Sequence, residues 1–231
     1  GLDFTQQYIL KLGIICLGIR LSFEEFIKFG SIAIPLIIVC IIGVLILIKL
    51  LIKKVPISSK MSYLIAIGTS VCGATAIVAT APVINAKKTE IAYAIANITL
   101  FGVIAMIAYP YFAEWYFNNE NLKAGLFLGT SIHETSQVAA AGLIYDQQFN
   151  SPETLNVATV TKLIRNTFLV IMIPLFAFLY NRGEVKNKSY SIFDIFPYFV
   201  LGFIGMILIR NVGDQIFSNE NENYFIWMNT I

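Results

Sequence analysis

Charged residues are scarce in this chain, at 13% of its 231 residues, whereas about a quarter of a soluble domain is charged. Hydrophobic residues make up 57% of the sequence, and the mean hydropathy is +0.74. Apolar runs recur that approach the roughly 20 residues a helix needs to cross the hydrocarbon core of a bilayer. The composition excludes an ordinary soluble domain and predicts an all-α, polytopic membrane protein.

The chain also lacks the residue clusters that bind metals, nucleic acids or nucleotides. Its three cysteines, Cys16, Cys40 and Cys72, lie in apolar runs, with no CxxC pair and no histidine at ligand spacing. The net charge of +2 is too small and too dispersed to indicate a nucleic-acid partner. No nucleotide-binding motif is present, so we expect no cofactor and no metal, and ion gradients rather than ATP would drive any transport.

Enzyme motifs are missing around the single histidine, His133. The sequence HETSQ is not the HExxH motif of zinc proteases, because Gln137 stands where the second histidine would be. Ser131 and His133 lack a GxSxG elbow and an orienting acid at a recognisable place. We therefore expect that the chain is not an enzyme.

Two similar segments stand out, GTSVCGATAIVATA at residues 68–81 and GTSIHETSQVAAAG at residues 129–142. Both place Gly, Thr and Ser inside apolar runs, where a membrane helix would normally carry Leu and Ile. Gly tolerates strained dihedrals, and Thr and Ser hydroxyls can satisfy backbone groups released at a helix break. The two segments are therefore predicted to be discontinuous or re-entrant helices that form a site. The alternative is that the small residues only let helices pack closely.

Ionisable residues near these segments extend the candidate site. His133 stands beside Glu134, and because a histidine changes charge near neutral pH, the pair is predicted to couple proton movement to transport. The alternative is a structural histidine at a helix interface. Lys162 and Arg165 share one helix face and would offer cations to an anion if that face looks inward, or reach to the lipid headgroups if it looks outward.

The predicted substrate-binding residues combine both segments with these two cations. Four hydroxyl residues, Thr69, Ser70, Thr130 and Ser131, are expected to line a polar cavity near the bilayer midplane. The full set is Gly68, Thr69, Ser70, Cys72, Gly73, Thr75, Gly129, Thr130, Ser131, Gln137, Lys162 and Arg165.

Apolar runs predict spans at 8–19, 31–52, 61–86, 91–109, 122–145, 155–180 and 192–209. Residues 21–29 are predicted to be an interfacial connection, and Pro110 is predicted to end the span at 91–109. The loops at 53–60 and 182–188 are basic and are therefore predicted to lie in the cytoplasm. The following loop is predicted to be external because it carries Asp214, Glu220 and Glu222. If both similar segments cross fully, the loop with Lys87 and Lys88 falls outside, against the positive-inside rule. If both enter and return as hairpins, every loop has the expected sign. Both threadings stay open.

The chain opens and closes abruptly on what look like partial spans, so we expect a fragment: a single transmembrane transporter domain over 1–231, incomplete at both ends. Residues 68–110 and 125–142, with YILKLGIICLGIRLSFEEF at 8–26 and VTKLIRN at 160–166, closely resemble the YeiH-like family of bacterial inner-membrane proteins, for which sulfate export has been proposed. The resemblance implies about two further spans before residue 1, and a small-residue-rich helix and a final span after residue 231.

That family is similar to the inverted-repeat superfamily of sodium/proton antiporters and bile-acid symporters, whose core has two discontinuous helices crossing near the midplane. By this likeness, residues 68–81 would be one crossing helix, with its partner beyond residue 231. The resemblance implies a multi-pass secondary transporter of the bacterial inner membrane that exports a small anion, such as sulfate or an organic sulfonate, by alternating access.

The predicted partners are a small anionic substrate, a coupling proton or sodium ion, and the lipid bilayer, with an oligomer left open. Two alternatives remain at this point. One is a sodium- or proton-coupled carrier of another organic anion, and the other is a non-transporting membrane sensor or scaffold.

Overall fold

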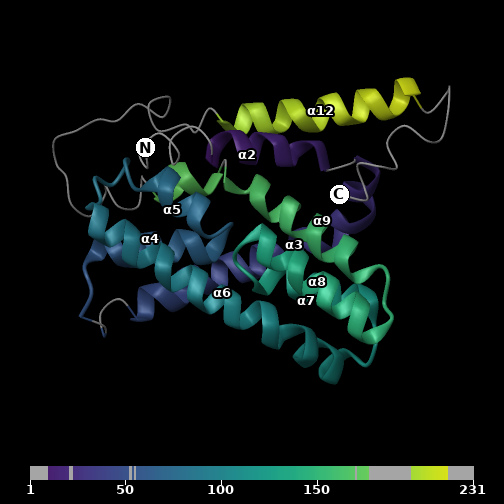
Figure 1. Ribbon diagram of the computed structural model, residues 1–231. Coiled ribbons are helices and arrows are strands. Elements are labelled where there is room, and N and C mark those ends of the chain that lie inside the picture. Colours follow the sequence, from purple (N-terminus) through teal and green to yellow (C-terminus); the bar gives the residue numbers. More distant parts are fainter. Residues whose placement is uncertain are drawn as a thin grey trace. The chain divides into compact units, whose positions relative to one another are not determined.

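The computed structural model describes residues 10–20, 23–51, 54, 56–169, 171–176 and 199–217 (Figure 1). Regular structure within these ranges is helical, without a strand, which confirms the predicted all-α class. Two of the helices are long and apolar enough to cross a membrane, over Phe26–Ile48 and Lys88–Phe117. The chain divides into two compact units, residues 1–30 with 197–231, and residues 31–196. The single domain over 1–231 stays a prediction.

The smaller unit pairs helix α2 (Leu10–Leu17), which the 3-10 turn η2 (Gly18–Arg20) extends, with helix α12 (Phe199–Phe217) (Figure 1). An Arg210 Nη1 donor reaches the Ile19 carbonyl at 3.3 Å and helps to fix this pair. Helix α12 continues through Asp214, so the loop predicted there begins later than expected. Glu220, Glu222 and the basic loop at 182–188 lie outside the described residues.

Two long helices carry prolines in their interiors. Helix α3 (Phe23–Leu51) contains Pro35, and helix α6 (Lys88–Phe117) contains Pro110. The separate connection predicted at 21–29 was therefore wrong from residue 23 on, and so was the prediction that Pro110 ends its span. An apolar helix tolerates proline where neighbouring groups satisfy the freed carbonyl, and the apolar sequence continues on both sides of each proline.

Both similar segments are broken helices, as predicted. The first consists of α4 (Ser59–Ser70) and α5 (Ala74–Thr80), separated at residues 71–73. The second consists of α7 (Asn121–Ser131) and α8 (Thr135–Phe149), separated at residues 132–134.

The first broken helix turns back on itself and forms a hairpin. Leu64 of α4 packs in one core cluster with Ile77 of α5 and with Ile84 beyond it. At the open end, Lys60 Nζ donates to the carbonyl of Asn85 at 2.8 Å. The chain thus leaves this hairpin on the side where it entered, and the partner that the superfamily likeness implied for this segment stays a prediction.

The second broken helix also forms a hairpin. Ala124 near the start of α7 and Tyr145 near the end of α8 belong to one core cluster, which also contains Ala113 of α6. The Tyr145 hydroxyl donates to Glu114 Oε2 at 2.6 Å, close to the point where α6 leads into α7. The beginning and the end of this segment therefore lie at the same end of α6.

The two hairpins approach from opposite ends of α6. The open end of the first lies at the start of α6, where the Ser58 hydroxyl donates to Glu90. The open end of the second lies at the other end, where Tyr145 contacts Glu114. The structure thus has the hairpin threading, the one in which every loop charge has the expected sign. Which end faces the cytoplasm stays a prediction.

Helix α9 (Thr154–Thr167) packs against both α7 and α8 (Figure 1). It ends before Phe168, so the single helix predicted over 155–180 is interrupted there. Residues 171–176 are again helical, and residues 177–180 lie outside the described part. Helix α9 brings Lys162 and Arg165 into the protein interior, where both side chains are buried.

Candidate functional site

The breaks of the two hairpins meet at the side chain of Lys162. This ammonium group donates to the carbonyl of Val71 at 2.9 Å and to the carbonyl of Ile132 at 3.0 Å. Val71 and Ile132 directly follow the last residues of α4 and α7, whose final carbonyls have no partner within their own helices. One buried cation therefore binds the backbone of both breaks.

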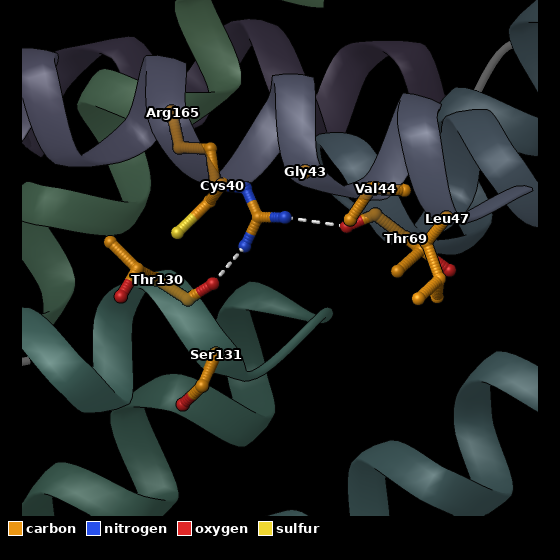
Figure 2. A pocket seen from close by; sticks show the side chains of 8 residues that line it. All are labelled: Cys40, Gly43, Val44, Leu47, Thr69, Thr130, Ser131 and Arg165. Atoms are coloured by element: carbon orange, nitrogen blue, oxygen red, sulfur yellow. Dashed lines mark hydrogen bonds between the residues drawn. The ribbon is translucent and has the colours of Figure 1, made fainter.

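Arg165 binds the last turns of the same two helices, one α-helical turn along α9. Its Nε donates to the carbonyl of Ser70 at 3.0 Å, and its two terminal nitrogens donate to the carbonyls of Thr130 and Thr69 (Figure 2). The residue is only 2% exposed. A cation at a helix C-terminus is favoured by the helix dipole, and here one guanidinium serves two such termini. The inward orientation of both cations, one of two alternatives from the sequence, is thus the observed one.

The hydroxyls of the last residues of α4 and α7 do not satisfy the broken backbone, contrary to expectation. Ser70, Thr130 and Ser131 each donate to the carbonyl four residues earlier in their own helix, at 2.6–2.7 Å. Such short side chains reach back along the helix more easily than across a break. The long side chains of Lys162 and Arg165 satisfy the released carbonyls instead.

Glu134 joins the two breaks from the other side. Its Oε1 accepts a hydrogen bond from the backbone N–H of Ala74 at 2.6 Å, at the first residue of α5. The N–H groups of a first turn lack intrahelical partners, and a carboxylate there is also favoured by the helix dipole. Glu134 therefore has a clear structural task, and its predicted role in proton coupling stays a prediction.

A cavity of about 340 Å³ lies beside Arg165 (Figure 2). It is partly open to the surroundings, and Leu47 in its wall is 56% exposed. Of the four hydroxyl residues predicted to line a cavity, Thr69, Thr130 and Ser131 do so, and Ser70 does not. The opposite wall belongs to α3, which the sequence analysis predicted only as a span. The small residues Cys40 and Gly43, at helical spacing, were the one feature of the sequence that could have indicated a cavity wall there. The lining consists of Cys40, Gly43, Val44, Leu47, Thr69, Thr130, Ser131 and Arg165.

Several predicted site residues lie near the breaks but do not line this cavity. Gln137 is buried on α8, and its Nε2 donates to the carbonyl of Thr99 on α6 at 3.3 Å. His133 lies in the second break, and its buried Nδ1 has no hydrogen-bond partner among the described residues. Their roles stay predictions, as do those of the other residues away from the cavity: Gly68, Ser70, Cys72, Gly73, Thr75, Gly129 and Lys162.

The fold and the site define a class, that of helical membrane proteins in which two opposed hairpins with broken helices meet at buried cations. Within this class, the chain belongs to the family described as conserved hypothetical protein 698, whose model matches residues 1–219.

The chain is similar to proteins named UPF0324 membrane protein. The one from Fusobacterium nucleatum is 37% identical over 233 residues, which cover 100% of this chain and 64% of that protein. The one from Streptococcus agalactiae is 37% identical over 92% of this chain and 63% of its own length. The one from Clostridium tetani is 35% identical over 92% of this chain and 64% of its own length. The chain thus spans less than two thirds of these relatives, and no solved structure matches it.

Proposed function

We propose that this chain forms the central part of a secondary transporter that exports a small anion, such as sulfate or an organic sulfonate, by alternating access. The observation that carries the proposal is the position of Arg165. Its guanidinium lines the cavity and at the same time binds the ends of both hairpins. An anion in the cavity would meet a cation that already holds the two elements together.

The membrane environment supports transport over a purely structural role. Broken helices at membrane depth are tolerated only where they face protein or a water-filled cavity, and transporters place such breaks at their binding sites. A sensor or scaffold gains nothing from two breaks and two buried cations. The opposed entry of the two hairpins also favours the inverted-repeat architecture.

Arg165 gives a physical route from binding to movement. A ligand shifts a conformational equilibrium only through different interactions with the two states. An anion that accepts hydrogen bonds from Arg165 competes with the carbonyls of Thr69 and Thr130 for the same donors. Binding would therefore change how firmly α4 and α7 are held together. The gradient of protons, bound at the His133–Glu134 pair, or of sodium ions would drive transport, without ATP and without enzymatic chemistry. The protein would be a multi-pass protein of the bacterial inner membrane.

The experiment is a flux assay on the full-length protein reconstituted in proteoliposomes. Labelled sulfate or methanesulfonate is loaded inside, and its efflux is measured with and without a pH or sodium gradient. We expect efflux that depends on a gradient and is lost in Arg165→Gln. The matched control is Lys123→Gln, which changes an exposed cation paired with Glu120 and should leave the rate unchanged. Efflux at the wild-type rate from Arg165→Gln, or none of either anion, would contradict the proposal.

A further inference from the structure

The hydroxyls that line the cavity have little to offer an anion. Thr130 Oγ1 donates to the carbonyl of Leu126 at 2.7 Å, and Ser131 Oγ donates to the carbonyl of Phe127 at 2.6 Å. A hydroxyl has a single proton, so both protons are already used within α7. Neither hydroxyl therefore has a proton left to donate to an anion.

Arg165 is also partly occupied. A guanidinium has five N–H donors, and hydrogen bonds to the carbonyls of Thr69, Ser70 and Thr130 use three of them. One N–H on each terminal nitrogen remains. Among the described residues, Thr69 is the lining hydroxyl for which no hydrogen bond is observed. The polar end of the cavity thus offers one cation, two N–H groups and one hydroxyl.

The rest of the lining is apolar. The wall from α3 consists of Cys40, Gly43, Val44 and Leu47, none of which is charged. In Figure 2, Val44 and Leu47 lie on the side of Thr69, and Cys40 lies on the other side of the guanidinium. The volume of about 340 Å³ lies at the lower end of the range for pockets that hold small organic ligands. An inorganic tetrahedral anion at Arg165 would leave the α3 wall without a partner.

The charge of the ligand distinguishes a sulfate dianion from an organic monoanion at this site. The cost of removing an ion from water rises with the square of its charge, and a buried charge is tolerated only when it is paired and hydrogen-bonded. A sulfate dianion would find one cation and few donors here. A monoanion needs only one opposite charge, and any apolar chain it carries can pack on α3.

As a refinement that rests on the proposed function, we propose that the ligand of this cavity is an organic monoanion with an apolar chain, such as an alkanesulfonate or an alkanecarboxylate. Its charged headgroup lies at Arg165 and Thr69, and its chain lies against Val44 and Leu47. Inorganic sulfate is the weaker ligand. The apolar wall, rather than the hydroxyls of the two similar segments, then determines which anions bind.

Cys40 provides a direct test, because its thiol lies in the cavity wall. In the full-length protein with Cys40 as the sole cysteine, the rate of alkylation by N-ethylmaleimide is measured with sodium sulfate or with methane-, propane- or hexanesulfonate. The alkanesulfonates should slow alkylation, with the half-protecting concentration falling about fourfold for each added methylene. Sulfate should protect only at higher concentration than hexanesulfonate. The matched control has Cys16, an exposed residue outside the cavity, as the sole cysteine, and should show no protection.

A second variant tests the wall without disturbing the cations. Val44→Thr keeps the shape of the side chain but adds a hydroxyl, and it should reduce the dependence of protection on chain length. Protection that is independent of chain length, or stronger by sulfate, would overturn the inference while leaving transport itself intact. A Cys40 that no anion protects, or that does not react, would also overturn it. The flux assay decides the proposed function separately, since it measures gradient-driven efflux of sulfate and methanesulfonate and not their relative affinity for the cavity.

Discussion

The carboxylate of Glu134 occupies the space that a side chain on Gly73 would need. Gly73 lies in the first break with φ of +69°, a conformation that residues with a Cβ rarely adopt. Its lack of a side chain lets Glu134 reach from the second break to the N–H of Ala74. The position of the Glu134 carboxylate in the second hairpin thus depends on the absence of a side chain at Gly73 in the first.

Replacement of Gly73 by alanine should destabilise the protein through both effects. A residue with a Cβ in this positive-φ conformation costs roughly 1–3 kcal/mol by itself, and displacing Glu134 adds to this loss. The unfolding free energy of the full-length protein in mixed micelles measures the change. Gly205→Ala is the control, since a Cβ at Gly205 meets no atom within 4 Å. Equal stability of the two variants would show that Glu134 does not need this space.

Glu134→Ala should lower the unfolding free energy by about 1.5–3 kcal/mol, because a hydrogen bond to a charged group is lost at the start of α5. Glu134→Gln keeps an oxygen that can accept from Ala74 and should recover much of this stability. Thermal unfolding of both variants, side by side, provides the measurement. If the glutamine variant is no more stable than the alanine variant, the bond to Ala74 is not what Glu134 contributes.

Lys162→Met should be strongly destabilising, although it replaces a buried charge by an apolar side chain of similar length. The carbonyls of Val71 and Ile132 would lose their shared donor, at a cost of about 1–3 kcal/mol for each unsatisfied group. Lys123→Met, at an exposed ion pair, should change stability by at most about 1 kcal/mol. Chemical denaturation of both variants tests this contrast, and a Lys162→Met protein as stable as wild type would refute the role of the ammonium group.

Gly129→Ala should impair transport more than Gly68→Ala. A Cβ at Gly129 would lie 2.6 Å from the carbonyl oxygen of Ala158, so α9 would have to move together with Arg165. A Cβ at Gly68 would meet only side-chain atoms, of Ile98 at 2.6 Å and of Ile77 at 2.9 Å, which can shift more readily than a backbone carbonyl. Efflux rates of the two variants, normalised to the amount of inserted protein, give the comparison. A larger loss in Gly68→Ala would contradict this reading of the packing.

The positions of both breaks could be predicted from sequence, because Gly, Thr and Ser in an apolar run are a local signal and occur twice. The loop charges allowed the hairpin threading but could not select it. The hairpin threading depends on contacts such as the hydrogen bond from Lys60 to Asn85. These residues are 25 positions apart in the sequence, and no local sequence pattern predicts that they meet. Pro110 misled the prediction, since proline ends helices in water more reliably than in an apolar helix.

The partners of the cations could not be predicted, because Lys162 and Arg165 bind main-chain carbonyls. Every residue has a carbonyl, so no residue type marks Val71 or Ile132 as an acceptor. The α3 wall was missed for a related reason. Val44 and Leu47 are ordinary residues for a span, and only the folded structure places them opposite Arg165.

The contacts of α9 also have a consequence for biosynthesis. A lysine or arginine at the centre of an isolated membrane helix costs about 2.5–3.5 kcal/mol on insertion scales, and α9 carries one of each within its 14 residues. This helix therefore has little tendency to leave the translocon for lipid by itself. The helix ends that accept its hydrogen bonds, in α4 and α7, are synthesised before it. The acceptor carbonyls in α4 and α7 are thus present before α9 is synthesised, and α9 can enter the bilayer by packing against these helices.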